Sequence, residues 1–232
     1  MKRLILLMIT CYCLLPGHAN TDIASDSLLQ VLQTLPHDTT RLSTLNDIIK
    51  IEQNNYKCIQ YSDTLMQEAL KLKNDKYASL AAYYHLLYYY NRSEQDSVAK
   101  WIVRMEPYVQ RSGLWDYFFD AQRFQIDLYT FTEQYELAIS EANKMKQKAL
   151  NTNSNRGTVA AYQCLSNAYI GSQRWDEGLK ALEEAYRLLP KKGNAVVHIS
   201  VLSQLISVTK EMKDNNRQLK YLQELESVLR KF

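Results

Sequence analysis

Glycine and proline are scarce in this sequence, which has 6 and 4 of them among 232 residues. So few turn-forming residues exclude a loop-rich all-β fold and a low-complexity chain. An excess of one charge is also missing, because 28 lysines and arginines stand against 25 acidic residues. This near balance offers no bulk electrostatic attraction to nucleic acid. The apolar share of 46% excludes disorder as the dominant state, and the many leucine, alanine, lysine, glutamate and glutamine residues favour helices.

Only one apolar run stands out, and it lies at the amino terminus. A positively charged start, Met-Lys-Arg, precedes the run from Leu4 to Leu15, which is too short to cross a bilayer core of about 30 Å. Small residues around Ala19 follow, so residues 1–19 have the layout of a secretory signal peptide cleaved after Ala19. We expect residues 20–232 to form one mature domain in the periplasm or outside the cell, with no membrane span. An uncleaved, membrane-anchored amino terminus is the alternative.

Residues suited to catalysis or metal binding are few and scattered. The histidines beyond the leader, His37, His85 and His198, form no zinc-binding pattern, and there is no nucleophile elbow or phosphate loop. We expect His85 to be a packed structural residue. We expect Cys58 and Cys164 to be separate buried thiols, although an oxidising compartment permits a disulfide. The sequence therefore predicts no enzyme, no catalytic residue, no cofactor and no metal. An enzyme site assembled across repeats is kept as a residual hypothesis.

A periodic pattern is clearest between Tyr162 and Pro190. Large and small residues follow each other there in a fixed order: Tyr162, Leu165, Ser166, Tyr169, Trp175, Gly178, Leu182, Ala185 and Pro190. Spacings of three and four put the first large residues on one helical face. Ser166 and Gly178 are small, so we expect two helices to approach closely at these positions. This order resembles the tetratricopeptide repeat signature. A hairpin of an ordinary helical bundle is the alternative interpretation.

The pattern recurs about every 40 residues, whereas 34 is usual in this family. Tyr169 corresponds to Tyr129 and Tyr89 at that spacing. The resemblance is weaker toward both ends of the chain. A leading helix is expected from Ser25 to Leu35. The predicted units lie near residues 38–74, 76–112, 114–152, 157–190 and 195–231. We assign the residues in excess of 34 to polar turns between units, at 151–157 and 191–194.

The resemblance implies an all-α fold, an α-α superhelix. It would be a right-handed solenoid of about five hairpins plus the leading helix. A single hairpin cannot bury its own apolar face, so neighbours must stack and leave a concave groove. Trp175 is expected to open a second helix and to cap the core of its hairpin. If its ring is fully buried, replacing it with alanine should cost about 3–5 kcal/mol.

Tyrosine is unusually frequent, with 17 in the chain. Tyr89 matches the core tyrosine of the family, and the other side of that helix lines the groove in its members. That comparison predicts eight groove residues: Tyr83, Leu87, Tyr90, Asp120, Arg123, Asp127, Gln163 and Asn167. The alternative is that the extra tyrosines fill a wide interface between helices. Some members grip a C-terminal carboxylate with Lys and Asn in the first unit. Here that helix offers Arg41, Thr44 and Ile48, so this ligand is not expected.

These features predict a non-enzymatic binding module. It would be an exported bacterial scaffold or adaptor that holds a protein or peptide, and no nucleic acid. The alternative function is an extracytoplasmic sensory segment of a transcription regulator or two-component system, truncated or stand-alone. The amphipathic stretch from Leu222 to Phe232 either packs on the preceding hairpin or docks a partner, including a second copy of the chain.

Overall fold

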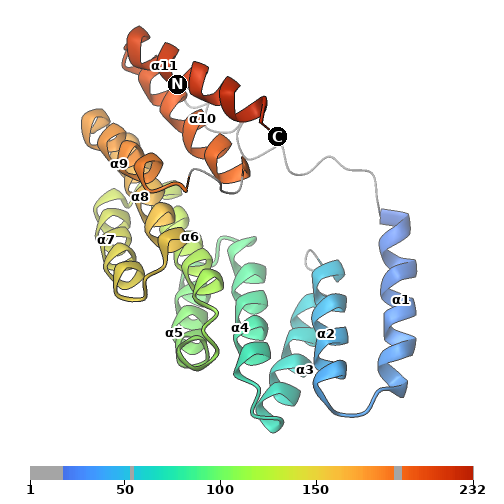
Figure 1. Cartoon of the computed structure of the whole chain (residues 1–232). Helices are drawn as coiled ribbons and strands as arrows, with labels where there is room; N and C mark the ends of the chain where they lie inside the picture. Colours follow the sequence, from blue (N-terminus) through green and yellow to red (C-terminus); the bar gives the residue numbers. More distant parts are fainter. Residues whose placement is uncertain (1–17, 53–54, 191–194, 232) are drawn as a thin grey trace.

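A computed structural model of the chain describes residues 18–52, 55–190 and 195–231, and these contain eleven helices and no strand. The helices are α1 (His18–Thr34), α2 (Thr39–Glu52), α3 (Lys57–Lys71), α4 (Asp75–Tyr90), α5 (Gln95–Ser112), α6 (Trp115–Phe131), α7 (Tyr135–Asn151), α8 (Asn155–Gly171), α9 (Trp175–Arg187), α10 (Ala195–Glu211) and α11 (Asn215–Leu229). Consecutive helices pack against each other along an open curve (Figure 1). The prediction of an all-α solenoid is confirmed.

A left-handed backbone turn recurs at regular intervals along the chain. The residues with positive φ, between 52° and 75°, are Lys73, Ser93, Gly113, Glu133, Asn153, Gln173 and Lys213. At six of them the next amide donates to the carbonyl five residues earlier, as from Asn74 to Ala69 at 2.8 Å. This bond closes a Schellman motif and stops the helix. The sequence repeat therefore consists of two equal halves, each a helix and one tight turn.

The residue after each such turn starts the next helix, and in three places its side chain caps that helix. Asn74, Ser154 and Asp214 accept hydrogen bonds from backbone amides in the first turns of α4, α8 and α11. The predicted turn at 151–157 is found at its expected place but is shorter, because α7 runs to Asn151 and α8 already begins at Asn155. Asn and Ser act here as helix-end residues rather than as loop. The predicted turn at 191–194 lies outside the described residues.

The first helices of the hairpins, α2, α4, α6, α8 and α10, lie on the inner side of the curve (Figure 1). Neighbouring first helices also contact one another, α2 with α4, α4 with α6 and α6 with α8. Buried apolar side chains run along the whole row. One cluster extends from Leu32 to Ala181, and a second joins α8 to α11. Each hairpin thus completes the interior of its neighbour, as expected for a solenoid.

The close helix approach expected at Ser166 and Gly178 is confirmed. Ser166 is fully buried, and a Cβ added at Gly178 would lie 2.7 Å from Ile170 Cγ1. Trp175 does open α9, but it is only half-buried, so the condition of full burial attached to the larger cost of its removal is not met.

The leading helix α1 begins at His18, earlier than predicted, and ends at Thr34, before Pro36. The predicted signal peptide falls almost wholly on residues 1–17, outside the described residues. Cys58 and Cys164 are both free and buried, as predicted. No helix within the described ranges is long and apolar enough to cross a membrane.

Candidate binding surface

The eight residues predicted for the groove come from α4, α6 and α8, and all eight are half-buried. We call this set, Tyr83, Leu87, Tyr90, Asp120, Arg123, Asp127, Gln163 and Asn167, the inner strip. The period of the repeat places Tyr83, Arg123 and Gln163 at the same level of three successive first helices. Half-burial leaves each side chain anchored by its neighbours and still accessible from one side. That combination suits a binding surface better than a sealed core.

The first part of the inner strip is aromatic and joins α4 to α6. The Tyr83 ring meets Tyr117 edge-on at 5.1 Å, and the Tyr90 ring stacks on Phe124 at 4.4 Å. These contacts also bear out the alternative interpretation in part, because the rings do fill the space between two helices. Burial raises the pKa of Tyr83 to about 12, so its hydroxyl stays neutral. The aromatic part of the inner strip therefore offers ring faces and neutral hydroxyl groups.

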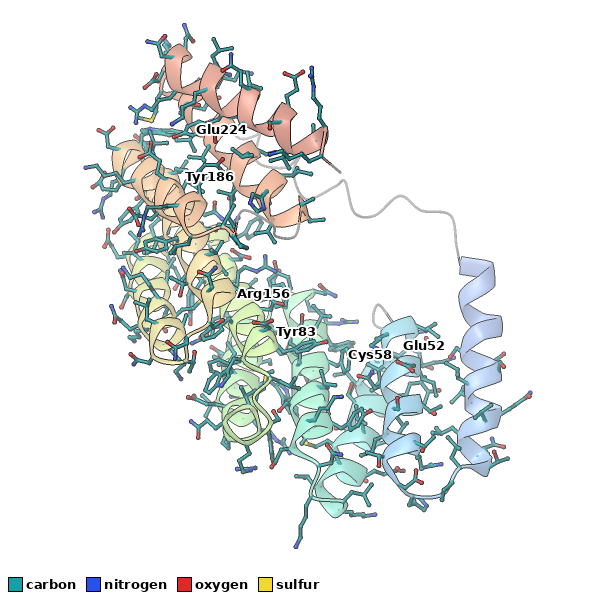
Figure 2. The ribbon with its side chains drawn as sticks, viewed as in Figure 1. Glu52, Cys58, Tyr83, Arg156, Tyr186 and Glu224 are labelled. Atoms are coloured by element: carbon teal, nitrogen blue, oxygen red, sulfur yellow. The ribbon has the colours of Figure 1, made fainter. Side chains whose placement is uncertain are left out.

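The second part of the inner strip is charged and lies on α6. Asp120 accepts a hydrogen bond of 2.8 Å from Nη2 of Arg156 on α8, whose Nη1 lies 3.8 Å from Asp116. Arg156 was missed by the sequence analysis. It and Tyr83 lie near each other on the inner side of the curve (Figure 2). Burial raises the pKa of Asp120, and Arg156 opposes this rise. This pair links two neighbouring hairpins across the strip.

One turn further along α6, Arg123 and Asp127 form a looser pair. Nη1 of Arg123 lies 3.8 Å from Oδ2 of Asp127. Burial raises the pKa of Asp127 to about 6, although the guanidinium of Arg123 works against this rise. Asp127 therefore takes up a proton more readily than an ordinary aspartate does.

The third part of the inner strip consists of side-chain amides between α8 and α10. Nε2 of Gln163 donates to Oε1 of Gln204 at 2.8 Å, and Nε2 of Gln204 donates to Oδ1 of Asn167 at 3.4 Å. Gln204 was another residue that the sequence analysis missed. These bonds leave Oε1 of Gln163 as an acceptor and Nδ2 of Asn167 as a donor. A donor and an acceptor on one surface match the C=O and N–H groups of a peptide bond.

His85 is a packed residue, as expected. The buried His85 ring stacks on Trp101 with centroids 4.0 Å apart, and its Nε2 lies 3.1 Å from Oδ1 of Asp63. Within the ranges described, no three His, Cys, Asp or Glu side chains gather as a metal site would require.

The carboxyl-terminal helix α11 packs on the preceding hairpin by one face. Tyr221 is buried there and donates to Oε1 of Glu183 at 2.9 Å. The other side of α11 exposes Leu219, Leu222 and Leu229, with exposed fractions of 58%, 44% and 57%. The packing interpretation of this helix therefore holds for one face only.

No protein-family model and no curated protein matches this sequence. Among solved structures, the chain is similar to the crystal structure of BtubC (BKLC) from P. vanneervenii. The two superpose with a TM-score of 0.62 at 13% identity, over 90% of this chain and 88% of that chain. At this identity the likeness concerns the fold alone, and it agrees with a row of helix hairpins.

Proposed function

We propose that this chain is a non-enzymatic scaffold or adaptor of the tetratricopeptide type, and that it holds an extended segment of a partner protein along the inner strip. The observation that carries the proposal is the alignment of half-buried rings, ion pairs and amides on successive first helices at a fixed period. Tyrosine and arginine bring large contact areas and hydrogen bonds at low entropic cost, which is why they dominate binding surfaces.

The dimensions of the strip suit a short extended peptide. Packed helices lie about 8–10 Å apart, so the three steps from α4 to α10 cover on the order of 27 Å, the reach of about eight extended residues. The free acceptor on Gln163 and the free donor on Asn167 then form hydrogen bonds with the peptide backbone. The aromatic part of the inner strip, near Tyr90, contacts a partner side chain. The leader-like residues 1–19 support a role in the periplasm or outside the cell.

Site-specific photo-crosslinking in the native cell tests this function. A photoreactive phenylalanine analogue placed at Tyr90 or Asn167 should capture a polypeptide, because both positions belong to the inner strip. Val103 on α5 is the matched control, since it is 72% exposed and lies outside the strip. We also expect that replacing Gln163 and Asn167 together with alanine lowers the adduct yield at Tyr90. Adducts of equal yield from Val103, or none from the two inner positions, would contradict the proposal.

A further inference from the structure

The Arg123–Asp127 pair differs from the other ion pairs around the inner strip. In the described part of the chain, neither side chain makes a hydrogen bond, and their nearest charged atoms are 3.8 Å apart. Asp120 and Arg156, by contrast, are joined by a hydrogen bond of 2.8 Å. The side chain of Arg123 is 39% exposed. It is therefore the cation of the inner strip whose hydrogen-bond donors are open to a ligand.

The groups that face Asp127 come from three helices. Tyr90 on α4 and Cys164 on α8 lie near it, and burial raises the pKa of both groups, so both are neutral. Arg123 on α6 is the cation that opposes the rise in the pKa of Asp127. Burial alone would lower the pKa of Arg123, but Asp127 and Asp120 raise it, so the guanidinium stays charged. As the pH falls, this pair loses its anion and keeps its cation.

We propose that the Arg123–Asp127 pair selects an acidic side chain in the bound segment, and that Asp127 takes up a proton from solvent when the ligand carboxylate docks on Arg123. This inference rests on the proposed function. A planar guanidinium can bind a carboxylate through two parallel N–H donors. Two carboxylates at one cation repel each other, so one of them is driven to its protonated form. The pKa of Asp127 is already about 6, so Asp127 is the carboxylate that takes up the proton.

An acidic side chain fits this position better than a carboxyl terminus. Arg123 lies in the middle of the inner strip, with the aromatic part on α4 before it and the amides of Gln163 and Asn167 on α8 after it. A segment that uses the whole strip must continue past Arg123 in both directions. The carboxylate at this point then belongs to a side chain within the segment. A basic side chain would meet Asp127, but it would also meet the repulsion of Arg123.

Defined peptide mixtures provide the probe. Three mixtures of acetylated and amidated peptides, about nine residues long to span the strip, share randomised flanks and carry Glu, Gln or Lys at the centre. Fluorescence anisotropy gives their affinities for the full chain at about pH 5.5 and about pH 7.5. We expect the Glu mixture to bind about tenfold more tightly than the Gln mixture at the lower pH, the effect of one charged bidentate contact. Calorimetry in two buffers at about pH 7.5, where Asp127 is ionised before the ligand docks, should show uptake of about one proton.

Two variants separate the roles of the pair. Asp127→Asn keeps the shape and removes the charge, so the Glu mixture should bind as well at the higher pH as at the lower. Arg123→Gln should bind the Glu and Gln mixtures equally. Circular dichroism melting curves check that each variant remains folded. A fourth mixture has Gln at the centre and a free carboxyl terminus, and we expect it to bind no better than the amidated Gln mixture.

The outcomes distinguish this inference from the function on which it rests. If the wild-type chain binds the Glu, Gln and Lys mixtures equally, the selection of an acidic side chain is wrong while peptide binding stands. A preference for Lys, or for the free carboxyl terminus, overturns the inference in the same way. If the wild-type chain binds none of the mixtures, both the inference and the proposed function fail.

Discussion

Replacing Gly113 with alanine tests the recurring left-handed turn without disturbing any packing. Gly113 has φ of 75°, and no other group lies within 4 Å of the position that a Cβ would take. The added methyl group meets no neighbour, so its cost comes from the backbone. A left-handed conformation costs a residue with a Cβ about 1–2 kcal/mol, and the stiffer unfolded chain returns about 0.4–1 kcal/mol. We expect Gly113→Ala to lower the free energy of unfolding by about 1 kcal/mol.

Glu133 supplies the matched opposite change, because it occupies the equivalent turn position one half-repeat further on, with φ of 60°. Glu133→Gly removes the left-handed strain and should be neutral or stabilising by up to about 1 kcal/mol. Urea unfolding followed by circular dichroism measures both variants, and equal m values would show that the same units unfold. In a chain of this size, about 1 kcal/mol moves the melting temperature by about 2–4 °C. A stabilising Gly113→Ala together with a destabilising Glu133→Gly would refute the turn assignment.

Three further predictions follow from side chains in the hairpins. Trp175→Ala should cost about 1–3 kcal/mol, less than for a fully buried ring, and an unchanged urea midpoint would contradict its contact with the core. Tyr84→Phe removes the bond of 2.9 Å from the hydroxyl to Oδ1 of Asn46 and should cost about 1 kcal/mol in the same assay. Burial lowers the pKa of His85, and the nearby Asp63 opposes this. The folded chain thus binds this proton less readily than the unfolded chain, and stability present above about pH 6.5 is lost as the pH falls. In His85→Phe the free energy of unfolding from urea titrations should fall less between about pH 7 and about pH 5 than in the wild type. An equal fall in both chains would refute this.

The architecture was predictable from the sequence because the repeat controls both the helix length and the turn position. Apolar residues at helical spacing predicted the hairpins, and a shift by one repeat aligned Tyr89, Tyr129 and Tyr169 correctly. The turn at 151–157 was predicted too long because Asn and Ser favour helix ends as well as loops. Gly157 was included in that turn because glycine is common in turns. In the structure it is a helical residue that sits against the Phe119 ring, where an added Cβ would lie 2.4 Å from Cδ2. Its role is set by a neighbour that sequence spacing alone did not identify.

The inner strip was predictable by position, but the partners of its side chains were not. Helical phase placed Asp120 and Gln163 on one surface, yet it did not indicate that Arg156 and Gln204 would bind them. These partners follow a rule that the structure makes visible. Asp120 and Arg156 are 36 residues apart, and Gln163 and Gln204 are 41 apart. Both separations are close to one repeat, because a residue on a first helix meets the next first helix within about a turn of its own level. Once the period is known, a search of this sequence one repeat ahead of each strip residue identifies both partners. The repeat therefore determines which positions meet, and the residue types at those positions give each level of the strip its own chemistry.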